Sequence, residues 1–128
     1  MSDPDTERQT GAFRIQITLP GAGRRRGHFD WSDDAFVILA GYERELDVFA
    51  FWDAGIYDGP AGIPFSRNCQ IRDSTLYAAM TQGLSEQRRR MHGGVDEDVV
   101  AATPSNLVRA IKRRWLLSID RMLAGTTP

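Results

Sequence analysis

The sequence predicts an α+β domain with a mostly antiparallel, curled sheet of about five strands and two helices, of which the C-terminal one is long. Strict alternation of apolar and polar residues at 13–19 is typical of a strand, and two apolar runs at 36–40 and 46–52 are joined by a connector of hairpin length. A long amphipathic pattern follows residue 103. A length of 128 residues, of which 41% are hydrophobic and 26% charged, fits one domain.

The first half of the chain contains a tail, a strand and a hairpin. Residues 1–11 are polar and aperiodic and are expected to form a disordered tail, so we assign the single domain to residues 12–125. The strand at 13–19 is followed by a glycine-flanked basic loop and then by the hairpin. Because the two apolar runs do not alternate, both faces of these strands are expected to be covered. Residues 54–66 contain three glycines and two prolines, which predicts a long loop.

The second half begins with a short strand at 67–72 and a helix that Asp73 or Ser74 caps and that ends at Gly83. A second basic loop at 86–94 and a last strand at 95–102 precede Thr103-Pro104, a typical helix start. The final helix is expected to end at Gly125. Its buried face is expected to be a row of apolar residues at intervals of four: Leu107, Ile111, Trp115, Ile119 and Leu123.

Charge is unevenly distributed, although the net charge is only −1. Residues 30–58 contain eight acidic residues and one arginine, while other arginines form three clusters. Binding to a phosphate backbone requires cationic side chains spread over a surface. The candidate phosphate-binding residues are therefore Arg24, Arg25, Arg26, Arg88, Arg89, Arg90, Arg109 and Arg113. The alternative is that each cluster is a solvated surface without a ligand.

Several function classes find no support in the sequence. No apolar stretch approaches the roughly 18–20 residues of a membrane span, and the N-terminus is unlike a signal peptide, so a cytoplasmic protein without a membrane partner is expected. Cys69 is the only cysteine, and no zinc-ligand spacing occurs, so we expect neither a disulfide nor a metal. His28 and His92 lie in arginine-bearing loops, which favours solvated or phosphate-contacting side chains over a general base. No cofactor is expected.

The acidic middle of the chain raises the alternative of an enzyme. Asp47 and Asp53 are six residues apart on the predicted strand and hence on one face, and nucleases hold divalent cations with such carboxylates. The only lysine, Lys112, belongs to a separate helix. We therefore favour a solvent-facing Asp47, a turn-capping Asp53 and a non-catalytic role over a small metal-dependent nuclease.

Base recognition requires hydrogen-bonding side chains on a rigid support. Arginine matches guanine, and asparagine and glutamine match adenine, so the segment 66–70 and the aromatic residues near it are of interest. The candidate base-reading residues are Trp52, Tyr57, Ser66, Arg67, Asn68 and Gln70. Two alternatives stay open. Asn68 and Gln70 could instead satisfy backbone groups of the loop, and the aromatic residues could belong to the core rather than to a pocket for an extruded base.

The chain resembles a small methylase-associated domain family of bacteria. The similarity is carried by Ala40-Gly41-Tyr42, by the run Val-Phe-x-x-Trp-Asp-Ala at 48–54 and by the run Ser-x-Asn-x-Gln at 66–70. Members of the family occur near DNA methyltransferases and restriction endonucleases in restriction and anti-phage loci. The resemblance implies an accessory role in recognising DNA or its modification state, and it points to Trp52, Asp53, Ser66, Asn68 and Gln70.

We therefore expect a non-catalytic DNA-recognition module of a bacterial restriction or anti-phage defence system. Its expected partners are double-stranded DNA and, in a larger complex, a DNA methyltransferase, a nuclease or another defence subunit. The alternative from a different class is a protein-interaction or homo-oligomerisation subunit, in which the acidic segment 30–58 meets a basic face. The DNA-recognition role predicts salt-sensitive binding to DNA. The oligomerisation role predicts that the molecular mass of the particle in solution increases with protein concentration.

Overall fold

The computed structural model describes residues 12–16, 29, 36–58, 68–91 and 94–125. Four antiparallel strands form one sheet in the order β2-β3-β6-β5: β2 (Leu39–Glu43), β3 (Val48–Trp52), β6 (Asp96–Ala102) and β5 (Leu84–Arg90). A separate two-stranded antiparallel ribbon pairs β1 (Ala12–Gln16) with β4 (Asn68–Arg72). The helices are α2 (Ala54–Tyr57), α3 (Asp73–Gln82) and α4 (Leu107–Gly125), with a 3-10 turn, η2 (Pro104–Asn106), before α4. The α+β class and the long C-terminal helix are confirmed, with six strands described instead of about five.

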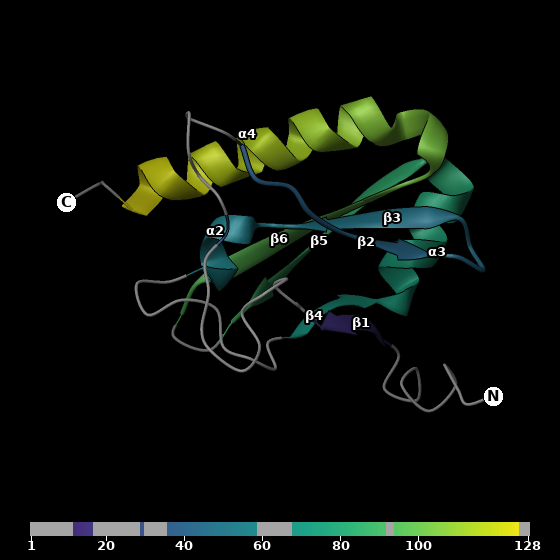
Figure 1. The fold of residues 1–128 in the computed structure, drawn as a ribbon, viewed down its shortest axis with the longest axis horizontal. Helices are drawn as coiled ribbons and strands as arrows, with labels where there is room; N and C mark the ends of the chain where they lie inside the picture. The colour runs from purple at the N-terminus through teal and green to yellow at the C-terminus, as the bar shows by residue number, and fades with distance from the viewer. Residues whose placement is uncertain (1–11, 17–28, 30–35, 59–67, 92–93, 126–128) are drawn as a thin grey trace.

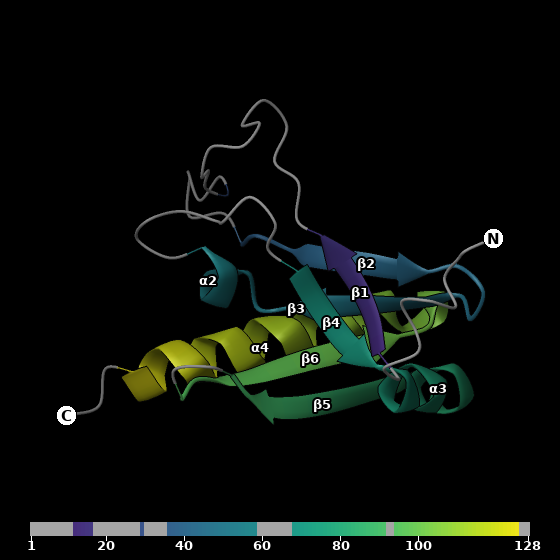
Figure 2. The same cartoon turned by 90° about the horizontal axis from the view of Figure 1, so that it is seen from below.

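The elements stack in three layers, as Figure 1 and Figure 2 show. Helix α4 covers one face of the four-stranded sheet, and the β1–β4 ribbon lies on the opposite face. Strand β3 lies inside the sheet and contributes to both cores. Its residues Val48, Ala50 and Trp52 belong to the core on the ribbon side, whereas Phe49 and Phe51 pack in the core below α4. The prediction that both faces are covered is confirmed for this run and wrong for residues 36–40, where Phe36 and Ile38 are exposed.

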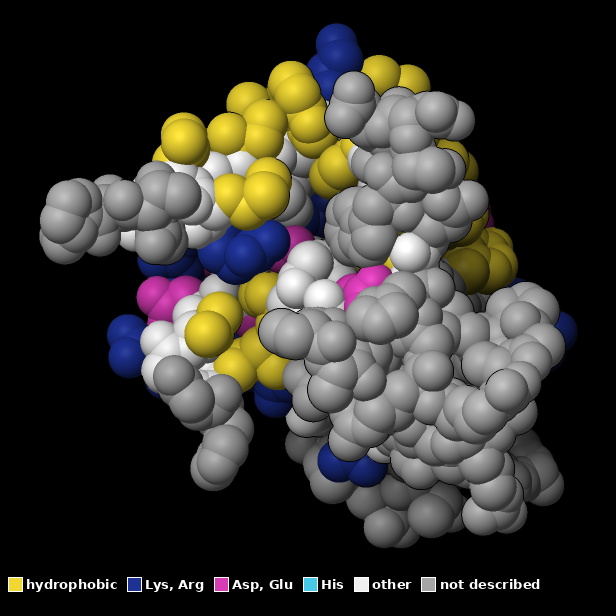
Figure 3. Space-filling view, turned by 60° about the vertical axis from the view of Figure 1, so that its left-hand side comes forward, with side chains coloured by type: hydrophobic (Ala, Val, Ile, Leu, Met, Phe, Trp, Pro, Cys, Tyr) yellow, Lys and Arg dark blue, Asp and Glu magenta, His cyan; other side chains and the backbone are white. Residues whose placement is uncertain are grey.

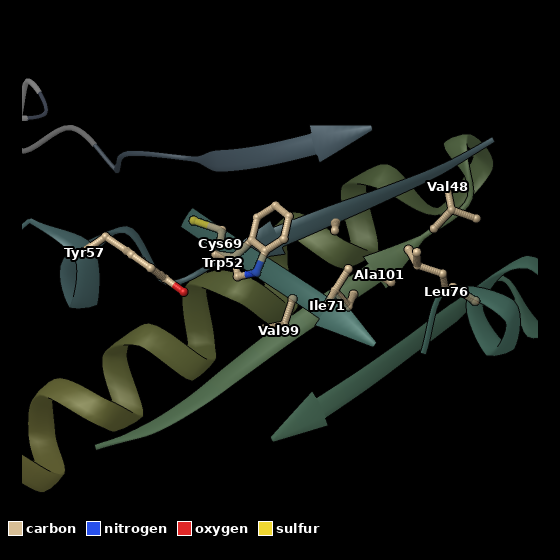
Figure 4. Packing of buried hydrophobic residues seen from close by; sticks show 10 residues of the cluster. Val48, Trp52, Tyr57, Cys69, Ile71, Leu76, Val99 and Ala101 are labelled. Atoms are coloured by element: carbon tan, nitrogen blue, oxygen red, sulfur yellow. The ribbon is translucent and has the colours of Figure 1, made fainter. Parts of the chain in front are cut away.

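The larger core holds the ribbon and α3 against the sheet. Trp52, Cys69, Ile71 and Leu76 are fully buried in it (Figure 4). The indole N–H of Trp52 donates to the backbone oxygen of Gln70 at 3.0 Å, which links β3 to β4. Burial of each large apolar side chain contributes roughly 1.5–3 kcal/mol, so the position of the ribbon is strongly determined.

Three elements differ from the sequence-based expectation. Residues 84–90, expected to belong mainly to a basic loop, form strand β5, because β6 offers each arginine an acidic residue in register. Residues 54–57, expected to be part of a loop, form α2. Helix α3 has Arg72 at its N-cap with no side-chain capping bond, so neither Asp73 nor Ser74 is the cap. Its predicted end is confirmed, since Gly83 adopts a left-handed φ of 91°.

The hairpin is shifted along the chain relative to the prediction. Strand β2 covers Leu39–Glu43 rather than 36–40, and the turn therefore lies at residues 44–47. Asp47 ends this turn with a φ of 56°, in the left-handed region that aspartate tolerates better than most residues. The hairpin itself, with β3 as its second strand, is confirmed by the antiparallel register.

The expected buried row of α4 is correct only in part, because Leu107 and Ile111 pack against the core below the helix whereas Trp115 and Leu123 do not. A row at intervals of four rotates by about 40° per step in a helix of 3.6 residues per turn, so between residues 107 and 123 it moves roughly 160° around the axis. Trp115 and Leu123 are accordingly exposed, at 47% and 61%. The residues of α4 that are buried are instead Ala110, Arg114, Leu117 and Ser118.

Candidate nucleic-acid interface

The β1–β4 ribbon presents a row of hydrogen-bonding side chains. Its antiparallel register sets Arg14 opposite Gln70, and the alternation along β4 puts Asn68 and Arg72 on the same face. Arg14, Asn68 and Arg72 are exposed, and Gln70 is half-buried. Neither strand contains an acidic residue, and the side chains that the structure describes on this face are two guanidinium groups and two carboxamides.

The opposite face of the ribbon fixes the row in place. Cys69 and Ile71 are fully buried, and Phe13 packs against the same core. At the end of β4, the backbone N–H of Arg72 donates to Oε1 of the buried Gln87 at 2.8 Å, which ties the ribbon to β5. The polar row therefore lies on a support that cannot turn without exposing apolar surface, as specific recognition requires.

Within the described part of the chain, the two arginines of the ribbon, Arg14 and Arg72, lack the ion pairs that the arginines of β5 form. Neither Arg14 nor Arg72 forms an ion pair with any residue that the structure describes. Their guanidinium groups can therefore meet an external anion or base without first breaking an internal ion pair.

The arginines of β5 are already paired inside the molecule. Residues 88–90 stand on a strand and not in a loop, and each faces an acidic residue of β6 across the sheet. The ion pairs are Arg88 with Asp98 at 2.7 Å, Arg89 with Glu97 at 3.0 Å and Arg90 with Asp96 at 2.8 Å. Opposite charges directly across two strands stabilise their pairing. The hydrogen bond that Arg88 donates to the Asp98 carboxylate also raises the pKa of Arg88. A phosphate would have to compete with these carboxylates.

Of the remaining phosphate candidates, one is ion-paired, one is hydrogen-bonded to a neutral side chain, and three lie outside the described residues. On α4, Arg113 donates from Nη2 to Glu86 Oε1 at 3.1 Å, and this hydrogen bond raises the pKa of Arg113. Arg109 is exposed and donates to Asn106 Oδ1 at 3.1 Å. The candidates at 24–26, together with Ser66 and Arg67, lie outside the described residues.

Two aromatic candidates for base reading are core residues. Trp52 is 0% exposed and Tyr57 is 2% exposed, which is the alternative that the sequence left open. The hydroxyl of Tyr57 donates to Glu97, itself fully buried on β6. Burial, and after it this hydrogen bond, raises the pKa of Tyr57. Both side chains act on the site only by holding β3, β4 and α2 together.

The two acidic candidates of the enzyme alternative do not lie together. Asp47 precedes β3 and Asp53 follows it, so the strand separates them by about 20 Å, and the expectation that both lie on it is wrong. Asp47 accepts a hydrogen bond from the Tyr42 hydroxyl at 2.7 Å. In the part of the chain that the structure describes, no three His, Cys, Asp or Glu side chains are grouped as metal ligands.

Asp53 instead anchors a buried charge centre between β3 and α4. Its carboxylate accepts from the Gly55 N–H at 3.1 Å, which makes it the N-cap of α2 and confirms the expected capping role. Arg121 donates to both carboxylate oxygens, and Arg114 Nη2 lies 3.7 Å from Oδ2. Arg114 is only 2% exposed, and burial lowers its pKa. Its guanidinium also donates to the backbone oxygen of Asp98, so this centre holds α4 on the sheet.

Comparison with known families places the chain. Residues 1–111 match the family model described as Methylase-associated X1. The chain belongs to the methylase-associated X1 family. Membership associates it with methyltransferase systems, as the resemblance implied, and the match includes both strands of the ribbon but only the start of α4. No curated protein and no solved structure matches the chain. Among the described helices of this family member, none is both long and apolar enough to cross a membrane.

Sequence reasoning missed Arg14 and Arg72 as members of the candidate interface. The alternation at 13–19 already placed Arg14 on the polar face of its strand. What it could not show is that β1 pairs with β4 and so sets Arg14 opposite Gln70.

Proposed function

We propose that the chain is a non-catalytic DNA-recognition module that reads the major groove with the outer face of the β1–β4 ribbon. The observation that carries the proposal is the row of Asn68, Gln70 and Arg14 on a rigid two-stranded support. A two-stranded ribbon fits the major groove, where arginine forms bidentate bonds with guanine, and asparagine or glutamine with adenine. The family association with methylases supports DNA as the ligand.

The dimensions of the ribbon agree with this role. A strand of five residues extends over about 16 Å, and the major groove is about 12 Å wide. Residues two apart on β4 are about 6.6 Å apart, close to two base-pair steps of 3.4 Å. Arg14 and Gln70, which face each other, have Cβ atoms roughly 5 Å apart and therefore reach neighbouring base pairs. Arg72, at the end of the ribbon, is assigned to a phosphate.

The segments on either side of the ribbon supply the remaining contacts in this proposal. Gln16 and Asn68 are paired in register, so the chain after β1 and the chain before β4 leave the ribbon at the same end. Arg24, Arg25 and Arg26 follow β1, and Ser66 and Arg67 immediately precede β4. The ion-paired arginines of β5 and α4 have a minor part, because their charge is already compensated.

The proposal is tested by fluorescence anisotropy with labelled duplexes, unmodified and methylated, across a salt series. Arg14→Ala should weaken specific binding by about 1–3 kcal/mol, the value of one bidentate base contact. The matched control is Arg90→Ala, which removes the same formal charge from an ion-paired position and should change affinity little. Arg14→Lys separates charge from geometry, since it keeps the salt dependence but loses the bidentate contact. Equal affinity of the Arg14→Ala variant and the unmodified chain would contradict the proposal.

The alternative of a protein-interaction subunit was expected to use the acidic segment 30–58, but the exposed apolar face of α4 favours it more. The described acidic residues of 30–58 include several that bind inside the chain: Glu43 accepts from the Leu46 N–H at 2.8 Å, and Asp58 accepts from the Phe29 N–H at 2.8 Å. Asp53 is buried in its charge centre. The acidic segment is therefore a weak candidate for docking a basic partner, whereas α4 exposes a continuous apolar face.

A further inference from the structure

Helix α4 has a second apolar face that the sheet does not cover. Five large side chains on it are between 47% and 66% exposed: Val108, Trp115, Leu116, Met122 and Leu123. Figure 3 shows hydrophobic side chains gathered over this helix. The spacings 108-115-122 and 116-123 are multiples of seven, the spacing with which one helix packs along another. Exposed apolar stripes of this kind mark interaction sites.

The charges beside this stripe indicate what covers it. Lys112, Leu116 and Asp120 follow one another at intervals of four, in a row that turns by about 80° around the helix between the two charges, and all three are exposed. Neither Lys112 nor Asp120 forms an ion pair with a residue in the described ranges. Eight residues of helix separate the two charges by about 12 Å, with Leu116 midway.

We propose that α4 packs against α4 of a second copy of this chain, antiparallel, about a two-fold axis at Leu116. In this arrangement Lys112 of each copy meets Asp120 of the other, so both ends of the contact join opposite charges. A parallel arrangement in register would bring like charges together. Such self-complementarity is what a two-fold interface requires, because the same patch is used on both sides.

The composition of the face fits an interface between proteins. Trp115 and Met122 are of the residue types that are enriched at interface cores. The row of Lys112, Leu116 and Asp120 is inclined to the helix axis, so two helices that meet along it cross at about 50° and contact each other mainly around Leu116. Helices that pack in this way approach to about 8–10 Å.

Pairing through α4 is independent of DNA binding. The β1–β4 ribbon lies on the other side of the sheet from α4 (Figure 1). The outer face of the ribbon therefore stays uncovered in each of the two paired copies. Self-association is measured without DNA, and its failure would leave the proposed function untouched. Conversely, a chain that pairs but does not bind DNA would support the α4 pairing and contradict the proposed function.

The test is sedimentation equilibrium of the full chain from low micromolar to hundreds of micromolar concentration. The unmodified chain should pass from one to two copies. Lys112→Glu should weaken association roughly tenfold, because the two-fold axis repeats each like-charge contact, and Asp120→Lys should do the same. The double variant K112E/D120K should recover the association, since it restores both pairs with exchanged signs.

Two further variants control for loss of folding and for non-specific association through exposed apolar side chains. Leu116→Glu places a charge at the axis and should abolish pairing, with the circular dichroism spectrum unchanged. Met80→Glu makes a similar change at a 42% exposed site on α3 and should leave the association unchanged. A single species of one copy at every concentration would overturn the proposal, and so would a double variant that associates no better than the single ones.

Discussion

Replacing Asp53 by alanine tests the buried charge centre that holds α4 on the sheet. The change removes the carboxylate that compensates Arg121 and the 2% exposed Arg114. Leaving one member of a buried ion pair without its partner costs about 3–5 kcal/mol, and loss of the α2 cap adds about 1 kcal/mol. Because domains are stable by only about 5–15 kcal/mol, Asp53→Ala should remove a large part of the free energy of unfolding.

The assay is urea denaturation followed by the fluorescence of the tryptophans, of which Trp52 is buried beside this centre. Asp53→Asn keeps an acceptor for the Gly55 N–H but removes the charge. It should therefore retain the contribution of the α2 cap to the free energy of unfolding and lose that of the ion pairs. Asp47→Asn removes an exposed carboxylate of the same hairpin, keeps a residue that tolerates the left-handed φ, and is the matched control. If Asp53→Ala unfolds within about 1 kcal/mol of the unmodified chain, Asp53 does not compensate the buried Arg114.

Three further predictions concern other parts of the fold. Because burial raises the pKa of Tyr57, the unfolded chain ionises first as the pH rises through about 10, so stability should fall above that pH, and Tyr57→Phe should flatten this decline in thermal melts. Gly83→Ala should cost about 1 kcal/mol or more in urea denaturation, since its φ is 91° and a Cβ would lie 2.7 Å from Asn106 Nδ2. Glu97→Ala removes a fully buried carboxylate that accepts from the buried Tyr57 hydroxyl and pairs with the half-buried Arg89, so it should cost about 3 kcal/mol, whereas Arg90→Ala, at an exposed ion pair, should cost less than about 1 kcal/mol. Equal costs for these last two would contradict the burial argument.

Local patterns were sufficient to predict elements whose residues determine their own environment. The apolar run that became β3 indicated a strand covered on both faces, and Gly83 marked the end of α3. The role of Asp53 as a cap followed from its place before a turn. In each case the deciding sequence signal lies within a few residues along the chain.

Features that depend on distant partners could not be predicted in this way. The arginines at 88–90 suggest a loop until β6 is paired with β5 and supplies its acidic residues. The ribbon joins β1 to β4 across more than fifty residues, so the neighbourhood of Arg14 and Gln70 is set by tertiary packing. Arg114 directly follows two other cationic residues in the sequence, and only the fold shows that it is buried beside Asp53.

The most direct test of the proposed function is a double-mutant cycle between Arg14 and guanine. Affinity is measured for the unmodified chain and for Arg14→Ala, each with the preferred duplex and with the same duplex carrying 7-deazaguanine, which lacks the N7 acceptor of the major groove. If Arg14 reads guanine from the ribbon, the two changes should be coupled by about 1 kcal/mol or more, and the variant should not distinguish the duplexes. Additive effects, or a variant as sensitive to the missing acceptor as the unmodified chain, would contradict the assignment of the ribbon to the major groove.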